Sequence, residues 1–227
     1  MYVKYPPAVK RFTSLFPNNL LFANDIKEDE TSHILNENFL DVLNSESSTE
    51  RTIINFIKDN QAYFIIASIL QYYSFGHHET YIFPEFQLGT SYKVDYLIVG
   101  KGSGGYEFVF IELEHPNRNI VLKAGHEGEA FRKGIQQIHD WKFWLNASFH
   151  SLHETFRKYK NPQKDLPEEF LITDPSRWQF VVVAGRRSDF SEKMYTKARD
   201  VKQNGILLLH YDNLYDKTKD ILKHGSF

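Results

Sequence analysis

The feature that most constrains the fold is a change of hydrophobic period between residues 73 and 116. Three runs in this stretch are rich in β-branched and aromatic residues: Tyr81–Leu88, Tyr92–Val99 and Tyr106–Glu114. Short turn segments separate them, which is typical of consecutive strands. Strands joined by short turns pair in the antiparallel sense. We therefore predict a three-strand antiparallel meander.

Helical spacing surrounds the meander on both sides. Glu30–Asn44 and Gln61–Tyr73 precede it, and Ser47 with Glu50 suggests a capping box that opens a helix between them. A long helical pattern follows Pro116. The chain then alternates, with buried strands predicted at Gln179–Ala184 and Ile206–Tyr211, a helix between them, and a last helix capped by Asp212. The fold class is α/β or α+β, with a mixed central sheet flanked by helices.

Length and composition set the outer limits. The chain has 227 residues, enough for one main domain, which we place at residues 49–227, with residues 1–48 as an amino-terminal arm or helical appendage. There is no cysteine, so thiolate metal sites are excluded and a reducing compartment is favoured. No apolar run reaches the roughly 20 residues of a membrane span, and no signal peptide is visible. We expect a cytoplasmic protein without a membrane partner.

One motif is rejected. Residues 100–105 formally satisfy Gly-x-Gly-x-x-Gly, the dinucleotide-binding pattern. That pattern binds phosphate only where the glycines lead into a helix, and here they lead into the predicted strand Tyr106–Glu114. The segment is interpreted as a hairpin loop.

Strand alternation supplies the most informative clue to function. Glu112 and Glu114 share one face at the end of the third strand. Asp95 lies in an otherwise apolar second strand, and in a hairpin it comes opposite the end of the third. Three carboxylates thus converge, and a divalent cation such as Mg²⁺ or Mn²⁺ is the usual way to relieve their repulsion. The alternative is a structural one, in which the acids pair with Lys93 or Arg118 or are solvated.

These residues carry a resemblance to a known superfamily. The pattern resembles the Asp…(Asp/Glu)-x-Lys signature of the PD-(D/E)XK restriction-endonuclease-like superfamily. Its parts follow in order: Asp95, the segment Ile-Glu-Leu-Glu-His that ends at His115, and Gln137 on the following helix. More narrowly, four segments resemble the nuclease domain of Shedu, a bacterial anti-phage defence family: Phe86–Gly89, Gln137–Trp141, Val183–Arg186 and His210–Leu214. The likeness spans residues 49–222.

The resemblance implies a restriction-endonuclease-like core that cleaves the double-stranded DNA of invading phage with Mg²⁺ or Mn²⁺, in a homo-oligomer such as a dimer or tetramer. Asp95 and Glu112 would be metal ligands and Gln137 would support the site. Glu114 departs from the pattern, because the superfamily usually has a lysine there. It could act as general base or ligate a second metal, which leaves the metal count open.

Further candidates surround the cluster. His115 adjoins it and Glu85 precedes it on the first strand, while Arg132 and Lys133 lie one turn before Gln137, where they could contact the DNA backbone. For Glu50 we favour a capping role. The net charge of −2 gives no global basic field. This keeps open a second function, in which the domain has lost catalysis through the Lys to Glu change and binds DNA ends or a partner protein.

Overall fold

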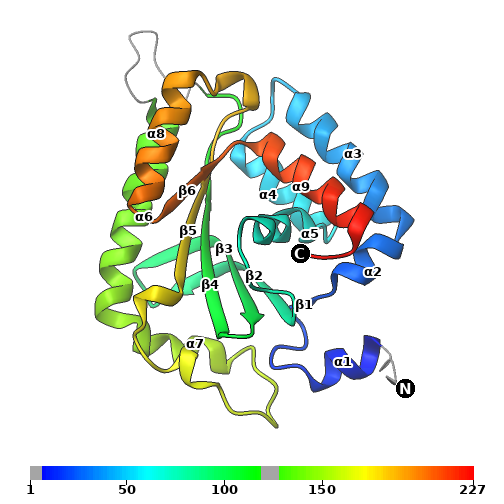
Figure 1. The fold of residues 1–227 in the computed structure, drawn as a ribbon, viewed down its shortest axis with the longest axis vertical. Helices are drawn as coiled ribbons and strands as arrows, with labels where there is room; N and C mark the ends of the chain where they lie inside the picture. The colour runs from blue at the N-terminus through cyan, green and yellow to red at the C-terminus, as the bar shows by residue number, and fades with distance from the viewer. Residues whose placement is uncertain (1–6, 119–127) are drawn as a thin grey trace.

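The computed structural model describes residues 7–118 and 128–227, and it is built around one six-stranded sheet with strand order β1 to β6 (Figure 1). Adjacent strands from β1 to β4 pair antiparallel, whereas β4, β5 and β6 pair in parallel. The strands are β1 (Leu20–Leu21), β2 (Glu79–Leu88), β3 (Tyr92–Gly102), β4 (Gly105–Leu113), β5 (Trp178–Val183) and β6 (Ile206–Leu209). The predicted mixed sheet flanked by helices is confirmed.

The predicted meander is only part of this sheet. The strands β2, β3 and β4 match the three predicted runs closely, but the sheet is a six-strand mixed sheet rather than a three-strand meander with separate additions. A two-residue strand, β1, pairs with β2 and is too short to leave a period in the sequence. The turn between β3 and β4 confirms that the glycine-rich segment is a hairpin loop, with Gly105 at φ +101° opposite Gly102.

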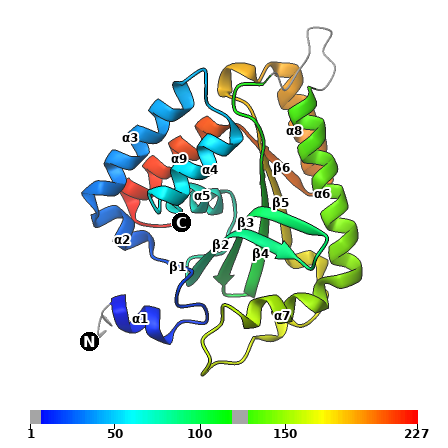
Figure 2. The same cartoon turned by 180° about the vertical axis from the view of Figure 1, so that it is seen from behind.

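Helices cover both faces of the sheet, as the two opposite views in Figures 1 and 2 show. One face carries α6 (Glu129–Ser148), α7 (Leu152–Arg157) and α8 (Glu192–Gln203). The other carries α3 (Glu30–Asn44), α4 (Glu50–Asp59), α5 (Phe64–Ala67) and α9 (Tyr211–His224). Two short helices, α1 (Pro7–Thr13) and α2 (Ala23–Glu28), precede them, and α2 packs against α9.

The sheet separates two hydrophobic cores. On β4, Phe108 and Phe110 face the core under α6, α7 and α8, while Val109 and Ile111 face the core under α3, α4, α5 and α9. The strand alternation read from the sequence is therefore confirmed. Because Glu112 continues the row of Phe108 and Phe110, it is directed toward α6.

Several local predictions need correction. The predicted helix over 61–73 is a short α5 followed by a 3₁₀ helix, Ser68–Tyr72. The capping box of α4 joins Thr49 and Thr52, not Ser47 and Glu50, because the helix begins at Glu50. The N-cap of α9 is His210 rather than Asp212. The division at residue 48 stays a prediction, and residues 1–6 of the proposed arm lie outside the described part of the chain.

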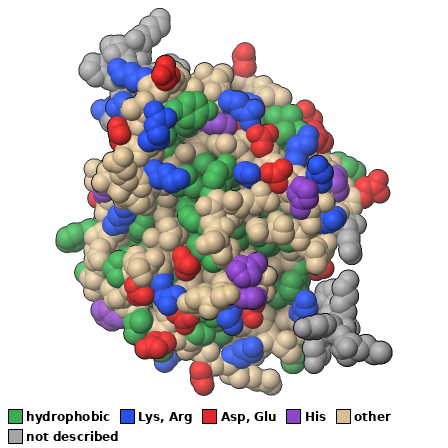
Figure 3. All heavy atoms as spheres, viewed as in Figure 1, with side chains coloured by type: hydrophobic (Ala, Val, Ile, Leu, Met, Phe, Trp, Pro, Cys, Tyr) green, Lys and Arg blue, Asp and Glu red, His purple; other side chains and the backbone are tan. Residues whose placement is uncertain are grey.

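The charge distribution agrees with the near-neutral net charge. Figure 3 shows Lys and Arg side chains interspersed with Asp and Glu side chains over the face seen in Figure 1. On this face no extended patch of one sign marks a nucleic-acid surface.

A buried carboxylate cluster as the candidate active site

Strand pairing brings the predicted acids together at the C-terminal end of β4, near the top of Figure 1. Tyr96 of β3 pairs with Ile111 of β4, so the next residues outward, Asp95 and Glu112, are neighbours across the two strands. The backbone N–H of Leu113 donates a 2.8 Å hydrogen bond to Asp95 Oδ2. This bond fixes the Asp95 carboxylate beside β4.

Glu112 and Glu114 are almost wholly inside the protein, with exposed fractions of 4% and 3%. Glu112 Oε2 is buried and has no hydrogen-bond partner among the described residues. Glu114 lies just past β4, where its backbone is held by Val183 O, to which its N–H donates, and by the Tyr211 hydroxyl, which donates to its carbonyl at 2.7 Å. The backbone is thus rigid while the Glu112 carboxylate is unsatisfied, an unfavourable arrangement in a protein interior.

Among the residues that the structure describes, a single cation forms an ion pair with these three acids. Lys133 of α6 places Nζ 3.1 Å from Glu114 Oε1, an ion pair whose geometry is not that of a well-directed hydrogen bond. The predicted structural partners are engaged elsewhere, since Lys93 pairs with Glu85 at 2.6 Å and Arg118 with Glu129 at 3.7 Å. No ion pair to Asp95 or Glu112 is found in the described chain.

Helix α6 approaches this end of the sheet very closely, and a glycine makes this possible. A Cβ atom on Gly134 would lie 2.7 Å from Val182 Cγ1 and 3.2 Å from Glu114 Cγ. The close packing carries Lys133 to the cluster. Gln137, one turn further on, is half-buried, and none of the described hydrogen bonds joins it to the acids.

Burial and mutual repulsion oppose the ionisation of the acids in this cluster. Burial, and then the charges of Asp95 and Glu114, raise the pKa of Glu112 strongly. Burial also raises the pKa of Asp95, against the opposing effect of the Leu113 N–H. Burial raises the pKa of Glu114 to about 7, although Lys133 opposes it. The fold keeps these three groups close at the expense of their ionisation.

A fourth acid, which we had assigned to helix capping, faces the same site. Glu50 lies in the first turn of α4, and its charge raises the pKa values of Asp95, Glu112 and Glu114. The sequence carried a signal, because Glu50 precedes the buried Ile53 and Ile57 at three- and seven-residue steps and so begins their face of the helix.

An open cavity of about 410 Å³ leads to the cluster. It lies between the start of α4, the segment after β4 and the start of α6, and is lined by both acids and bases: Thr49, Glu50, Arg51, Glu114, His115, Arg118, Glu129, Ala130 and Lys133. His115 therefore lies at the site, as predicted from its position; its Nδ1 accepts a hydrogen bond from the Asn117 N–H, and burial lowers its pKa. Arg132 is exposed, and Glu85 is a surface strand residue.

Donor chemistry and geometry give different answers about a metal. Buried carboxylates with an unpartnered oxygen are the donors that Mg²⁺ and Mn²⁺ prefer. Yet over residues 7–118 and 128–227 no three His, Asp or Glu side chains are grouped so that they could hold a metal ion together. The residues thus fit a hard cation chemically, while their side chains are not gathered around one point.

Comparison with known proteins adds the family. Residues 47–215 match the family model of the C-terminal region of the Shedu protein SduA. The chain belongs to the Shedu family. No curated protein matches it. Membership in the Shedu family implies a role in anti-phage defence.

The region matched to Shedu contains the whole cluster. Glu50, Asp95, Glu112 and Glu114 all lie within residues 47–215, as does Lys133. The helices α1, α2 and α3 all precede the matched region. The Shedu-like part of the chain is therefore the part that builds the cavity.

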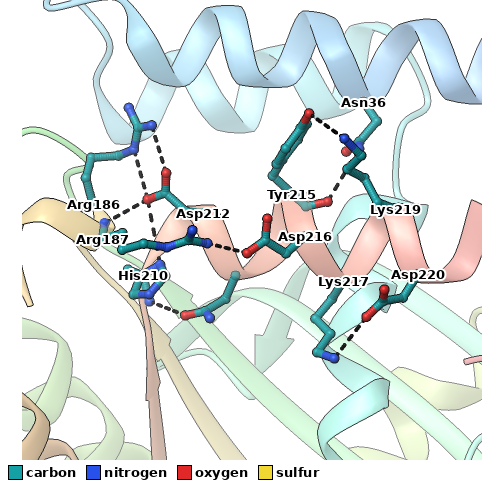
Figure 4. A network of polar contacts seen from close by, with 11 residues as sticks. Asn36, Arg186, Arg187, His210, Asp212, Tyr215, Asp216, Lys217, Lys219 and Asp220 are labelled. Atoms are coloured by element: carbon teal, nitrogen blue, oxygen red, sulfur yellow. Dashed lines mark hydrogen bonds and ion pairs between the residues drawn. The ribbon is translucent and has the colours of Figure 1, made fainter.

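A second charged network lies at the neighbouring end of β5 and β6 (Figure 4), and its central pair, Arg186 and Asp212, lies within the Shedu match. Arg186 binds both oxygens of Asp212, through Nη2 at 2.9 Å and Nε at 3.1 Å. It also donates to the carbonyl of Leu43 and to Asn44 Oδ1 at 3.1 Å. Asp212, predicted as a helix cap, instead pairs with Arg186 and with it ties α3 and α9 to the sheet.

No helix in the described residues of this Shedu family chain is both long and apolar enough to cross a membrane.

Proposed function

We propose that the protein is a metal-dependent deoxyribonuclease with a restriction-endonuclease-like core, which hydrolyses phosphodiester bonds of invading double-stranded DNA in anti-phage defence. The observation that carries the proposal is the buried Glu112 carboxylate, with one oxygen unpartnered and two further acids beside it. A structural role would supply a cationic partner, because an unpaired buried carboxylate is destabilising. Its retention favours a role in binding a cation.

The metal would be held by Asp95 and Glu112, beside Glu114, whose Oε1 is paired with Lys133. When bound, Mg²⁺ or Mn²⁺ supplies a Lewis acid for the phosphate and a more acidic water. The reaction forms a bond from the water oxygen to phosphorus and breaks one ester bond; the water's proton passes to a base, and the leaving alkoxide takes up a proton. Gln137 would support the site from α6.

The protein's own residues would bind and orient the DNA. Arg51, Arg118 and Lys133 line the cavity together with Glu50, Glu114 and Glu129, so cations are available beside the acids. Phosphate contacts from such side chains position a duplex without reading its sequence. Arg132, exposed on α6, would extend this set along the DNA backbone. The same proposal includes a homo-oligomer, which would set two such cavities on one duplex. It also includes a cytoplasmic location.

The test is a gel assay on linear and circular DNA with Mg²⁺, Mn²⁺ or EDTA, comparing the wild-type protein with Glu112→Gln. The amide preserves the shape of the side chain while removing its charge. We expect metal-dependent cleavage by the wild type and its loss in the variant, with both proteins folded by circular dichroism. Equal cleavage by the two proteins would place the active site elsewhere.

One observation favours a second candidate, a nuclease-like domain that binds DNA ends or a partner protein without cutting. Glu114 stands where a catalytic lysine is usual in the resembling superfamily, and it pairs with Lys133. DNA binding by the wild type without cleavage under any metal would support this candidate. Gain of cleavage in Glu114→Lys would then identify the residue responsible.

A further inference from the structure

A phosphodiester that enters the cavity faces an electrostatic obstacle. Four carboxylates act on the same small region: Glu50, Asp95, Glu112 and Glu114. In water such charges are screened, but two of these groups are buried, where repulsion is stronger. A hydrolytic reaction on an anion here therefore needs a fixed positive charge aimed at the phosphate, in addition to any metal.

Among the described residues, Lys133 is the cation that has the position for this. In the described part of the chain, the only ion pair to any of the four acids is the one made by Lys133. Its Nζ is 3.1 Å from Glu114 Oε1, while 55% of its side chain remains exposed and lines the cavity. The ammonium group is thus anchored on one side by a buried carboxylate and open to solvent on the other.

The packing of α6 makes this position well defined. Gly134, the next residue, contacts Val182 and Glu114 so closely that no larger side chain fits without a shift. Glu114 in turn is held through its backbone by Tyr211 and Val183. The backbones that carry both partners are thus fixed, and the ion pair with Glu114 directs the Lys133 ammonium group to this place, as preorganised transition-state stabilisation requires.

We propose that Lys133 is a catalytic residue whose ammonium group contacts a non-bridging oxygen of the scissile phosphate, and that Glu114 is the positioning residue that holds it there. The inference rests on the proposed nuclease function. The inference explains why an acid stands at position 114, where the resembling superfamily usually has a lysine. Glu114, just past the strand, holds the ammonium group of Lys133, which comes from the helix α6.

The competing explanation is that Lys133 only neutralises Glu114. Both explanations predict that Lys133→Ala is harmful, so a second substitution must separate them. If neutralisation is the whole role, Glu114→Gln in the Lys133→Ala background removes the need for the cation and restores activity. If the phosphate needs the charge, Glu114→Gln restores nothing, whereas Glu114→Lys returns a cation to the site from the strand.

The experiment measures single-turnover cleavage of linear duplex DNA at saturating protein with Mg²⁺. We expect Lys133→Ala to slow cleavage about 100-fold or more, as loss of one preorganised donor does. The double variant with Glu114→Gln should stay as slow, and the one with Glu114→Lys should recover at least about tenfold. Lys202→Ala, which removes an exposed lysine of α8, is the control and should cleave as the wild type does. Recovery with Glu114→Gln would overturn the proposal.

A binding measurement in EDTA gives a readout that does not depend on turnover. If Lys133 contacts a phosphate, Lys133→Ala should reduce the slope of log Kd against log salt by about 0.9, and Lys202→Ala should not. Should the wild type cut no DNA with any metal, the proposed nuclease function fails, and the slope still decides the phosphate contact. If the slope of log Kd against log salt were the same for Lys133→Ala and the wild type, the proposed phosphate contact would be overturned.

Discussion

The two charged clusters at the same end of the sheet are built on opposite principles. Arg186 and Asp212 satisfy each other with two hydrogen bonds, and the pKa of Asp212 falls because Arg186 and the Arg187 N–H outweigh its burial (Figure 4). Glu112, beside Asp95, forms no ion pair with any described cation, and its pKa rises. The first arrangement stabilises the folded chain, and the second destabilises it. A fold that keeps both indicates that the second is retained for function.

The largest effect should come from breaking the satisfied cluster. Arg186→Ala leaves Asp212 half-buried without its partner and frees the carbonyl of Leu43. We expect a loss of about 3 kcal/mol in the free energy of unfolding, as for other buried pairs that lose one member, and a fall in Tm of about 6–12 °C. Urea and thermal denaturation measure both quantities.

The matched control is Arg187→Ala. Arg187 pairs with Asp216, but about half of each side chain is exposed. An exposed pair contributes less than about 1 kcal/mol. If the two arginine variants lost equal stability, the contrast between buried and exposed members of this network would be wrong.

In the carboxylate cluster, removing a charged group is expected to raise the free energy of unfolding rather than lower it. A carboxyl group whose pKa is raised by folding takes up a proton on folding, so its stabilising contribution is complete below the unfolded pKa of about 4.3 and is lost as pH rises through the folded value. For Glu112 the shift is upward. Glu112→Gln should therefore stabilise the metal-free protein by about 2 kcal/mol at pH 8, and the difference should shrink toward pH 4.5.

Denaturation in EDTA across pH 4.5–8.5 checks this prediction. A structural role for the acids, the alternative left open by the sequence, predicts that Glu112→Gln destabilises the protein at neutral pH. Asp95→Ala serves as the companion variant, since it removes a neighbouring charge but also the acceptor for the Leu113 N–H. It should gain less stability than Glu112→Gln.

A smaller effect is expected from the metal itself. A cation that binds the folded chain stabilises it by about 1.4 kcal/mol at ten times its Kd, which corresponds to a rise in Tm of about 3–5 °C. We expect this rise for the wild type with Mg²⁺ or Mn²⁺, reversed by EDTA, and little change in Glu112→Gln. An equal rise in both proteins would place the metal outside the cluster.

The contrast between the clusters also explains what the sequence could reveal. The convergence of Asp95, Glu112 and Glu114 followed from strand period and hairpin pairing, which are local rules. The partner of Asp212 did not, because Arg186 lies on a different strand end and the contact depends on how β5 and β6 pack beside α3. Local propensity made Asp212 a helix cap, and tertiary contacts overrode it.

Lys133 was predicted to contact the DNA backbone because of its place on the helix. Its ion pair with Glu114, however, depends on the close approach of α6 to the sheet at Gly134. Nothing in helical periodicity specifies such a distance. Glu50 was assigned to helix capping rather than to the site, for a different reason. Two capping patterns overlapped between residues 47 and 52, and the chosen one started the helix too early. The site was thus predictable where it depends on strand pairing and obscured where it depends on helix packing.

The smallest expected change in stability comes from Glu50, and it tests whether Glu50 is coupled to the other acids. Glu50→Gln removes one of four like charges without emptying space, so the metal-free protein should gain only about 0.5 kcal/mol at pH 8, the scale of changes at partly exposed sites. Glu46→Gln makes the same chemical change four residues earlier on an exposed loop and should leave stability unchanged. Because the charge of Glu50 contributes to the raised pKa of Glu112, the gain should disappear in a Glu112→Gln background. A gain that persisted there would show that Glu50 acts independently of the cluster, and the cavity would then hold three coupled acids rather than four.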